Sequence, residues 1–312
     1  MRTLITVTEV NAMKQLTLRV LWVAFGIVSP ACTTEHERSG RNTAGAAPYV
    51  VALSTANHTF QAPDTINAGW ATFRFANNGD DIHFAHIVQL DSGRTVPELV
   101  SAYAEAIRTS GPRPKWVTRF GGPGGAAPGD SSVVTQHLEP GSYVWICPVE
   151  DSGGNPHFGK GEFKAFVVRS ASPDAVGPEA APTATMSIRL MDYAFAIETP
   201  LTAGQHTIRV ANAGVEPHDL VLLKLVPGKS VEDVIMSLNP ERARRADQKD
   251  QPAEPLPSIG SLAGGIAAMR SGMEAFFTTT LTPGEYVLLC MATTPDGRSH
   301  IEHGMIQQIR IQ

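Results

Sequence analysis

The sequence has little charge for its length, and it contains no block of lysine and arginine interleaved with aromatic residues. Charged residues make up 18% of the 312 positions, and the formal net charge is −5 at pH 7. A nucleic-acid-binding protein needs a basic patch, so we expect no nucleic acid as a partner. Strand-like runs outnumber helical ones, and glycine and proline are plentiful, with 28 and 23 residues. These proportions favour an all-β protein with many turns.

No long apolar segment opens the chain either, because the run Val20–Val28 is too short to cross a bilayer. Basic residues precede this run and small residues follow it, which is the order of an export signal. We therefore expect a signal peptide over residues 1–32, followed by a flexible polar tether over 33–47. Cys32 directly follows the small residues, and this arrangement resembles the lipobox of bacterial lipoproteins. The resemblance implies acylation of Cys32; ordinary signal cleavage near this point is the alternative.

An exported chain of this kind is expected in the periplasm or on the outer surface, and lipidation would anchor it to the membrane. Cysteine is scarce, and three residues are an odd number for such a protein. If Cys32 is acylated, Cys147 and Cys290 remain. These two occupy equivalent positions of an internal repeat, whereas a disulfide needs α-carbons within about 7 Å. Each is therefore expected to be a separate thiol with its own role.

The internal repeat is the strongest organising feature of the sequence. Residues 60–77 align with residues 195–212 at a constant offset of 135. Residues 138–147 align with residues 281–290 at an offset of 143, which places an eight-residue insertion in the second copy. The chain is therefore interpreted as a duplication.

Each copy is expected to form one domain, over residues 48–169 and 184–312, with a Pro- and Ala-rich linker at 170–183 between them. Apolar and polar residues mostly alternate with a period of two in both copies, which predicts half-buried strands. One helix is expected in each copy, at about 96–108 and about 230–245. This pattern predicts two tandem Greek-key β-sandwiches, each with one helical insertion.

Four residue types in the second copy follow one another in an informative order. His218 comes directly after Pro217 at the start of a predicted strand, and Cys290 ends another strand. Nine residues separate Cys290 from His300, and four separate His300 from Met305. A thiolate, two imidazoles and a weak axial thioether form the ligand set of a blue-copper electron-transfer site. Because three of the residues share one loop, the site is expected at one end of the sandwich.

This order resembles that of the cupredoxins, the group that includes plastocyanin, azurin and copper nitrite reductase. The resemblance implies copper as the cofactor, with His218 and His300 as imidazole ligands, Cys290 as the thiolate and Met305 as the axial ligand. The sequence departs from the family at two points. The loop between Cys290 and His300 is longer than in the small electron carriers. Asp219 stands where the family has the asparagine that ties the two ligand loops together.

The first copy has His83, Cys147 and His157 at the matching positions, but Glu162 stands at the position of Met305. A carboxylate in place of the thioether makes a harder ligand set, which favours Cu(II) or Zn(II) over Cu(I). This copy is therefore expected to be either a second, different metal site or a structural domain without metal.

Two further histidines, His86 in the first copy and His303 in the second, are competing ligand candidates because they lie three residues from predicted ligands.

The function expected from these residues is electron transfer through a type 1 copper site in the second copy, together with an unidentified redox partner protein. A two-domain copper reductase or oxidase is the first alternative. His-x-His pairs are missing from the sequence, and this weakens the enzyme reading because such enzymes cluster histidines around a catalytic copper. A metal-free interaction module is the second alternative, and Glu162 is the residue that favours it.

Overall fold

The computed structural model describes residues 49–312 except for 110, 152, 171–180 and 239–255. The predicted signal peptide, the tether and Cys32 lie outside the described residues, as does most of the predicted linker. Within the described part of the chain, no helix is long and apolar enough to cross a membrane. The division into domains at 48–169 and 184–312 stays a prediction.

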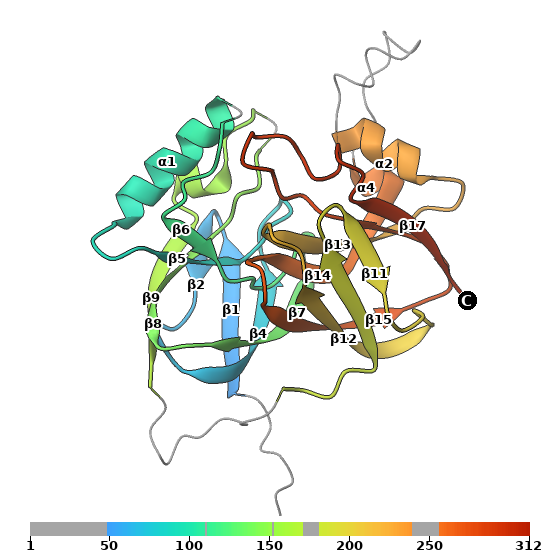
Figure 1. The fold of residues 1–312 in the computed structure, drawn as a ribbon, viewed down its shortest axis with the longest axis horizontal. Coiled ribbons are helices and arrows are strands. Elements are labelled where there is room, and N and C mark those ends of the chain that lie inside the picture. The colour runs from blue at the N-terminus through green and yellow to red at the C-terminus, as the bar shows by residue number, and fades with distance from the viewer. Residues whose placement is uncertain (1–48, 110, 152, 171–180, 239–255) are drawn as a thin grey trace, which may run out of the picture. The chain divides into compact units, whose positions relative to one another are not determined.

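The first copy is built mainly from short strands, with one helix and one 3-10 turn (Figure 1). Its elements in chain order are β1 (Tyr49–Ala56), β2 (Thr59–Gln61), β3 (Thr65–Asn67), β4 (Gly69–Asn77), β5 (His86–Leu90), α1 (Val96–Arg108), β6 (Val117–Arg119), β7 (Ser131–Leu138), β8 (Gly141–Ile146), η1 (His157–Lys160) and β9 (Phe163–Arg169).

The second copy repeats this order with small differences. Its elements are β10 (Met186–Met191), β11 (Ala194–Ile197), β12 (Gly204–Asn212), β13 (His218–Leu225), α2 (Val231–Leu238), α4 (Leu256–Ile259), β14 (Gly260–Met269), β15 (Glu274–Leu281), β16 (Gly284–Leu289) and β17 (Ile306–Ile311). The short helix α4 was not expected from the sequence. The predicted helix at 230–245 begins one residue late, and its later half lies outside the described residues.

Each copy is a sandwich of two sheets, as predicted. One sheet of the first copy has the order β3-β9-β8-β5-β6, and one sheet of the second has the order β14-β13-β16-β17. The opposing sheets of both copies join in a single eight-stranded sheet of order β11-β10-β12-β15-β7-β4-β1-β2. The junction is the antiparallel pair of β15 with β7, in which Phe277 lies opposite Val134. The expected fold class, two tandem β-sandwiches with helical excursions, is confirmed.

The helix α1 forms where the sequence predicts it because its first turn is capped. Thr95 accepts a hydrogen bond from the Glu98 amide, and the Glu98 carboxylate accepts one from the Thr95 amide at 2.8 Å, which completes a capping box. The helix buries Leu99 and Tyr103 in a cluster with residues of β5 and β8. It therefore covers the outer face of its sheet, away from β1 and β4 (Figure 1).

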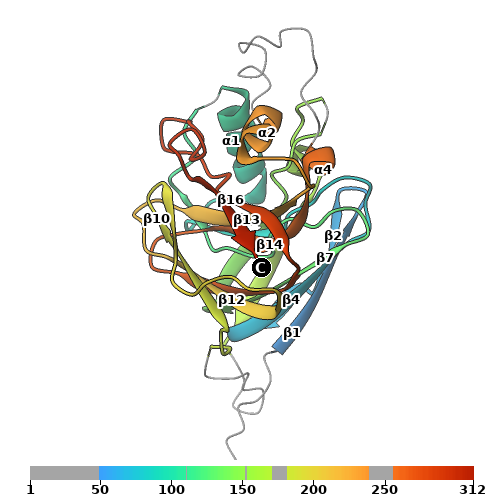
Figure 2. The same ribbon diagram turned by 90° about the vertical axis from the view of Figure 1, so that its right-hand side faces the viewer.

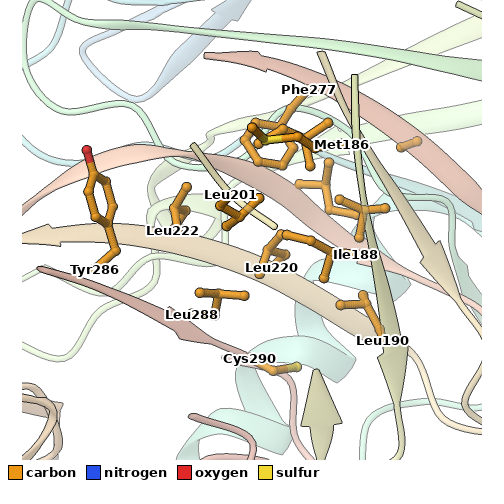
Figure 3. Packing of buried hydrophobic residues seen from close by; sticks show 14 of the residues in the cluster. Met186, Ile188, Leu190, Leu201, Leu220, Leu222, Phe277, Tyr286, Leu288 and Cys290 are labelled. Atoms are coloured by element: carbon orange, nitrogen blue, oxygen red, sulfur yellow. The ribbon is translucent and has the colours of Figure 1, made fainter. Parts of the chain in front are cut away.

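The second copy is layered in the same way. Its strand β13 is buried on both faces, because one face meets the opposing sheet and the other is covered by α2. Figure 2 shows α2 on the side of β13 and β16 that is turned away from β12. Inside the sandwich, alternate residues of facing strands form the core, and Figure 3 shows the row Tyr286, Leu288 and Cys290 leading through it. Cys290 therefore lies inside the core of the second sandwich.

The repeated Gly-Gly pairs allow a close approach to the strand that follows the first predicted histidine of each copy. A Cβ at Gly122 would lie 2.2 Å from the carbonyl oxygen of Ala85, and one at Gly265 would lie 2.0 Å from that of Leu220. Both glycines have positive φ, of 109° and 140°. Any side chain there would displace the backbone of Ala85 or Leu220, each two residues after a predicted ligand, so the glycines help to position His83 and His218.

Candidate metal centres

The four residues predicted in the second copy meet at one end of its sandwich. His218 is the first residue of β13, Cys290 directly follows β16, and His300 and Met305 lie on the loop between β16 and β17. All four are fully buried, with 0% exposure each. The backbone fixes the loop, because the Cys290 amide donates to the Met305 carbonyl at 3.2 Å and the Met305 amide donates to the His300 carbonyl at 2.9 Å.

The donor atoms of this cluster converge. The Nδ1 atoms of His218 and His300 lie 3.0 Å apart, and the Cys290 Sγ lies 3.8 and 3.5 Å from them. A thiolate and an imidazole bound to one ion at about 2.3 and 2.0 Å would be about 3.5–3.7 Å apart at bond angles of about 110–120°. The sulfur–nitrogen distances therefore match those around a shared metal ion, and the nitrogen pair is a few tenths of an ångström closer than such angles require.

Each histidine of this cluster is oriented by a carboxylate on its other nitrogen. The His218 Nε2 lies 2.9 Å from Asp192 Oδ1, and the His300 Nε2 lies 2.9 Å from Glu216 Oε2. Because a carboxylate accepts, the Nε2 atoms carry the protons and the Nδ1 atoms face each other as lone pairs. Two such lone pairs beside a sulfur are arranged to bind a cation. Neither carboxylate was predicted from the sequence.

Asp219 keeps the tie between the two ligand loops that the sequence put in doubt. Its Oδ1 accepts a hydrogen bond of 2.7 Å from the amide of Met291, the residue after Cys290. Burial raises the pKa of Asp219 to about 6. Burial and the nearby Asp219 carboxylate raise the pKa of the Cys290 thiol well above its usual value. Burial and the proximity of His218 lower the pKa of His300 to about 4, which keeps this imidazole neutral at pH 7.

The two competing histidines lie outside the clusters found in the described residues. His303 stacks on Tyr193 with ring centroids 4.6 Å apart. His86 is the first residue of β5 and lines a cavity of about 510 Å³ together with Phe84 and Arg119. Burial and the nearby Arg119 lower the pKa of His86 to about 3. Neither histidine is placed to replace a predicted ligand.

The four residues predicted in the first copy also meet. The Nδ1 atoms of His83 and His157 are 3.2 Å apart, and Glu162 Oε2 lies 2.8 and 3.2 Å from them. The Cys147 Sγ lies 3.9 Å from His83 Nδ1 and 3.6 Å from His157 Nδ1. Thr55 donates to the second carboxylate oxygen at 2.5 Å. Burial opposes ionisation of Glu162, but the bonds from His83 and Thr55 prevail and lower its pKa.

One further histidine of this cluster was missed. His58, in the turn between β1 and β2, has its Nδ1 3.8 Å from Glu162 Oε2 and its ring centroid 4.5 Å from that of His157. The donor atoms of His58, His83, His157 and Glu162 all lie within 4.8 Å of one another. Extending the repeat by two residues would have found it, because His58 aligns with Tyr193 at the offset of 135.

Both described cysteines are free and buried, so the expectation of two separate thiols is confirmed. The donor set of the second copy is that of a type 1 copper site, with two imidazoles, a thiolate and a buried methionine. The donor set of the first copy is harder, because a carboxylate replaces the thioether and a third imidazole is present.

Comparison with known proteins adds solved structures only. No family model matches the sequence, and no curated protein matches it. The chain is similar to auracyanin A, described as a "blue" copper protein from Chloroflexus aurantiacus, with 21% identity over 39% of this chain and 100% of that one, at a TM-score of 0.29. It is also similar to reduced auracyanin from Roseiflexus castenholzii, with 20% identity over 39% of this chain and 98% of that one, at a TM-score of 0.27.

A longer match is the Cu-containing nitrite reductase from Thermus scotoductus, with 13% identity over 86% of this chain and 68% of that one, at a TM-score of 0.22. At these scores the matches carry no argument of their own. The fold of this chain, two β-sandwiches that share one eight-stranded sheet, follows from its own strand order, and His218, Cys290 and His300 gather at one end of the second sandwich.

Proposed function

We propose that this protein is an exported electron carrier that binds copper at His218, Cys290, His300 and Met305. The observation that carries the proposal is the convergence of two unprotonated imidazole nitrogens and a cysteine sulfur, all buried, at 3.0–3.8 Å from one another. Bound copper would supply one-electron chemistry between Cu(I) and Cu(II).

The residues of the site hold one geometry by their own contacts. His218 is fixed by Asp192 and by the start of β13, and His300 is fixed by Glu216 and by its place in the loop. Asp219 ties the residue after the cysteine to the strand of the first histidine. Because the ligands are held before a metal arrives, little rearrangement is needed when charge at the site changes. A site of this kind favours rapid passage of an electron over binding of a substrate.

A redox partner is expected to dock over this end of the sandwich. Val215 is 82% exposed and directly precedes Glu216, and Met291 is 46% exposed and directly follows Cys290. Exposed apolar side chains beside a buried redox site favour a brief contact with a partner protein. The partner stays unidentified.

Export and anchoring belong to the same proposal. They are supported by the signal-like segment before Cys32 and by the resemblance to a lipobox. Metabolic labelling with a radioactive fatty acid should mark the wild-type protein and leave Cys32→Ser unlabelled. Wild-type protein that is released into the culture medium without the fatty-acid label would instead support ordinary signal cleavage.

The experiment that tests the copper site is reconstitution of the full chain with Cu(II). Thiolate-to-Cu(II) charge transfer should turn the protein blue, and Cys290→Ser should remove the colour. Cys147→Ser is the matched control, because it removes the equivalent buried thiol from the first copy and should leave the colour intact. A wild-type protein that stays colourless would favour the metal-free interaction module, and a blue Cys290→Ser protein would refute the ligand assignment.

A further inference from the structure

The first copy contains a second cluster of metal-binding side chains, formed by His58, His83, His157 and Glu162. Two ligands bound to one ion at about 2.0–2.1 Å lie about 3.3 Å apart at a tetrahedral angle. Three of the pairs in the cluster are separated by 2.8, 3.2 and 3.2 Å, and the pair of His58 with Glu162 by 3.8 Å. The cluster therefore has the dimensions of one tetrahedral site.

The two copies of the repeat differ at two positions that face their clusters. Glu162 occupies the backbone position of Met305, because each amide donates to the carbonyl of the preceding histidine and each carbonyl accepts from the cysteine amide. His58 occupies the position of Tyr193, in the turn of the first hairpin of each copy. Tyr193 packs against His300 with ring centroids 5.3 Å apart. The first copy therefore has a carboxylate where the second has the soft thioether of Met305. It also has an imidazole where the second has the phenol ring of Tyr193.

His58 lies in a tight turn that places its imidazole beside the cluster. His58 has a φ of 56° and Asn57 a φ of 49°, in a two-residue hairpin turn between Ala56 and Thr59. A glycine is favoured at the second position of such a turn, because side chains are strained at positive φ. The Nδ1 of His58 is buried and has no hydrogen-bond partner. Tyr193 has a similar φ of 64°, so this turn is common to both copies, and the feature that favours a bound cation at His58 is the unpartnered nitrogen 3.8 Å from the Glu162 carboxylate.

We infer that the first copy binds a divalent metal ion of the Zn²⁺ class through His58, His83, His157 and Glu162. Four protein donors complete a tetrahedral site, and a site without an open position is structural rather than catalytic. His83, His157 and Glu162 are at most 1% exposed and the His58 side chain is 26% exposed, so three of the four donors are shielded from solvent. Three imidazoles and a carboxylate suit a divalent ion, whereas Cu(I) prefers sulfur; the Cys147 Sγ lies 3.6 and 3.9 Å from two of the imidazole nitrogens but outside the group of four donors that converge. The two copies would therefore hold different metals.

The test is titration of the metal-free full chain with Zn²⁺, in a background of Cys290→Ser and His300→Ala that disables the second site. One equivalent of Zn²⁺ should bind, and the melting temperature should rise with Zn²⁺ concentration. In the same background, His58→Gly should weaken Zn²⁺ binding by more than about tenfold, since even partners outside the ligand shell are worth that much. His137→Ala is the matched control, because it removes a histidine of the first copy that pairs with Glu139 and lies outside the cluster.

The choice of glycine separates a ligand from a structural residue. Glycine suits the positive φ, so the metal-free His58→Gly protein should melt no lower than its parent. Failure of the parent to bind Zn²⁺, or undiminished binding by His58→Gly, would overturn the inference. The result is independent of the copper proposal, because His58→Gly in the otherwise wild-type chain should still turn blue with Cu(II).

Discussion

The carboxylate of Glu216 offers a sharp test of how the second copy holds its metal. Glu216 Oε2 accepts the Nε2 proton of His300 at 2.9 Å and so keeps the Nδ1 lone pair directed at Cys290. Glu216→Gln preserves shape and removes the charge. The neutral amide accepts a weaker hydrogen bond from the imidazole, so the ligand becomes less basic and its orientation less fixed.

The expected loss can be bounded from the structure. Removal of such an outer partner typically costs 10–100-fold in metal affinity. The Glu216 side chain is 24% exposed, so solvent screens part of its charge, and an amide oxygen still accepts. We therefore expect the lower end, a roughly tenfold weaker Kd, which is about 1.4 kcal/mol. Asp192→Asn is a less specific test, because Asp192 also accepts hydrogen bonds from the Val215 and Glu216 amides, and its substitution would weaken these as well.

The assay is competition for copper between the protein and a chromophoric chelator, with the blue band recorded to show that the Cys290 thiolate is still bound. Glu302→Gln is the matched control, since this carboxylate lies on the loop that carries His300 and accepts a hydrogen bond from the Ser299 amide. The control should keep wild-type affinity. If Glu216→Gln and Glu302→Gln were indistinguishable, the carboxylate would not tune the ligand and the reasoning would be refuted.

Three other predictions follow from the same structure. Met305→Leu should keep the blue colour and raise the reduction potential measured by voltammetry, because loss of a weak donor disfavours Cu(II); an unchanged potential would argue against axial ligation. The fragment 183–312 should self-associate in sedimentation experiments, because it exposes the edge of β15 and Phe276, which packs on Trp70; a stable monomer would contradict this. Burial lowers the pKa of His86 to about 3 in the folded protein. Below the ordinary pKa of 6.5, the unfolded state therefore binds a proton that the folded state does not. The free energy of unfolding falls for this reason as the pH drops from 6.5 towards 3. Between pH 7 and pH 5 the wild type should lose about 1–2 kcal/mol more unfolding free energy than His86→Gln, measured by urea titration; equal losses would show that this histidine is not shielded.

Much of the candidate site could be predicted because its order along the chain is a local property. The spacing of Cys290, His300 and Met305 is set by one loop, and His218 begins a strand that its own apolar run predicts. The helix expected at about 96–108 likewise forms over Val96–Arg108, since its cap and its periodicity lie within the segment itself. Features of this kind can be predicted from the sequence because they depend on residues that are close together in the chain.

Other features depend on which distant segments meet, and local pattern does not encode this. His58 joins the first cluster only because a hairpin turn folds over the end of the sandwich, 25 positions before His83. The carboxylates of Asp192 and Glu216 reach the histidines in the same way. The pairing of β15 with β7 was also unforeseen, because an edge strand alternates apolar and polar residues whatever its partner. The sequence by itself determined which donor types each copy owns and in what order; the tertiary structure alone decided which atoms converge, because convergence is set by packing between segments that are far apart in the chain.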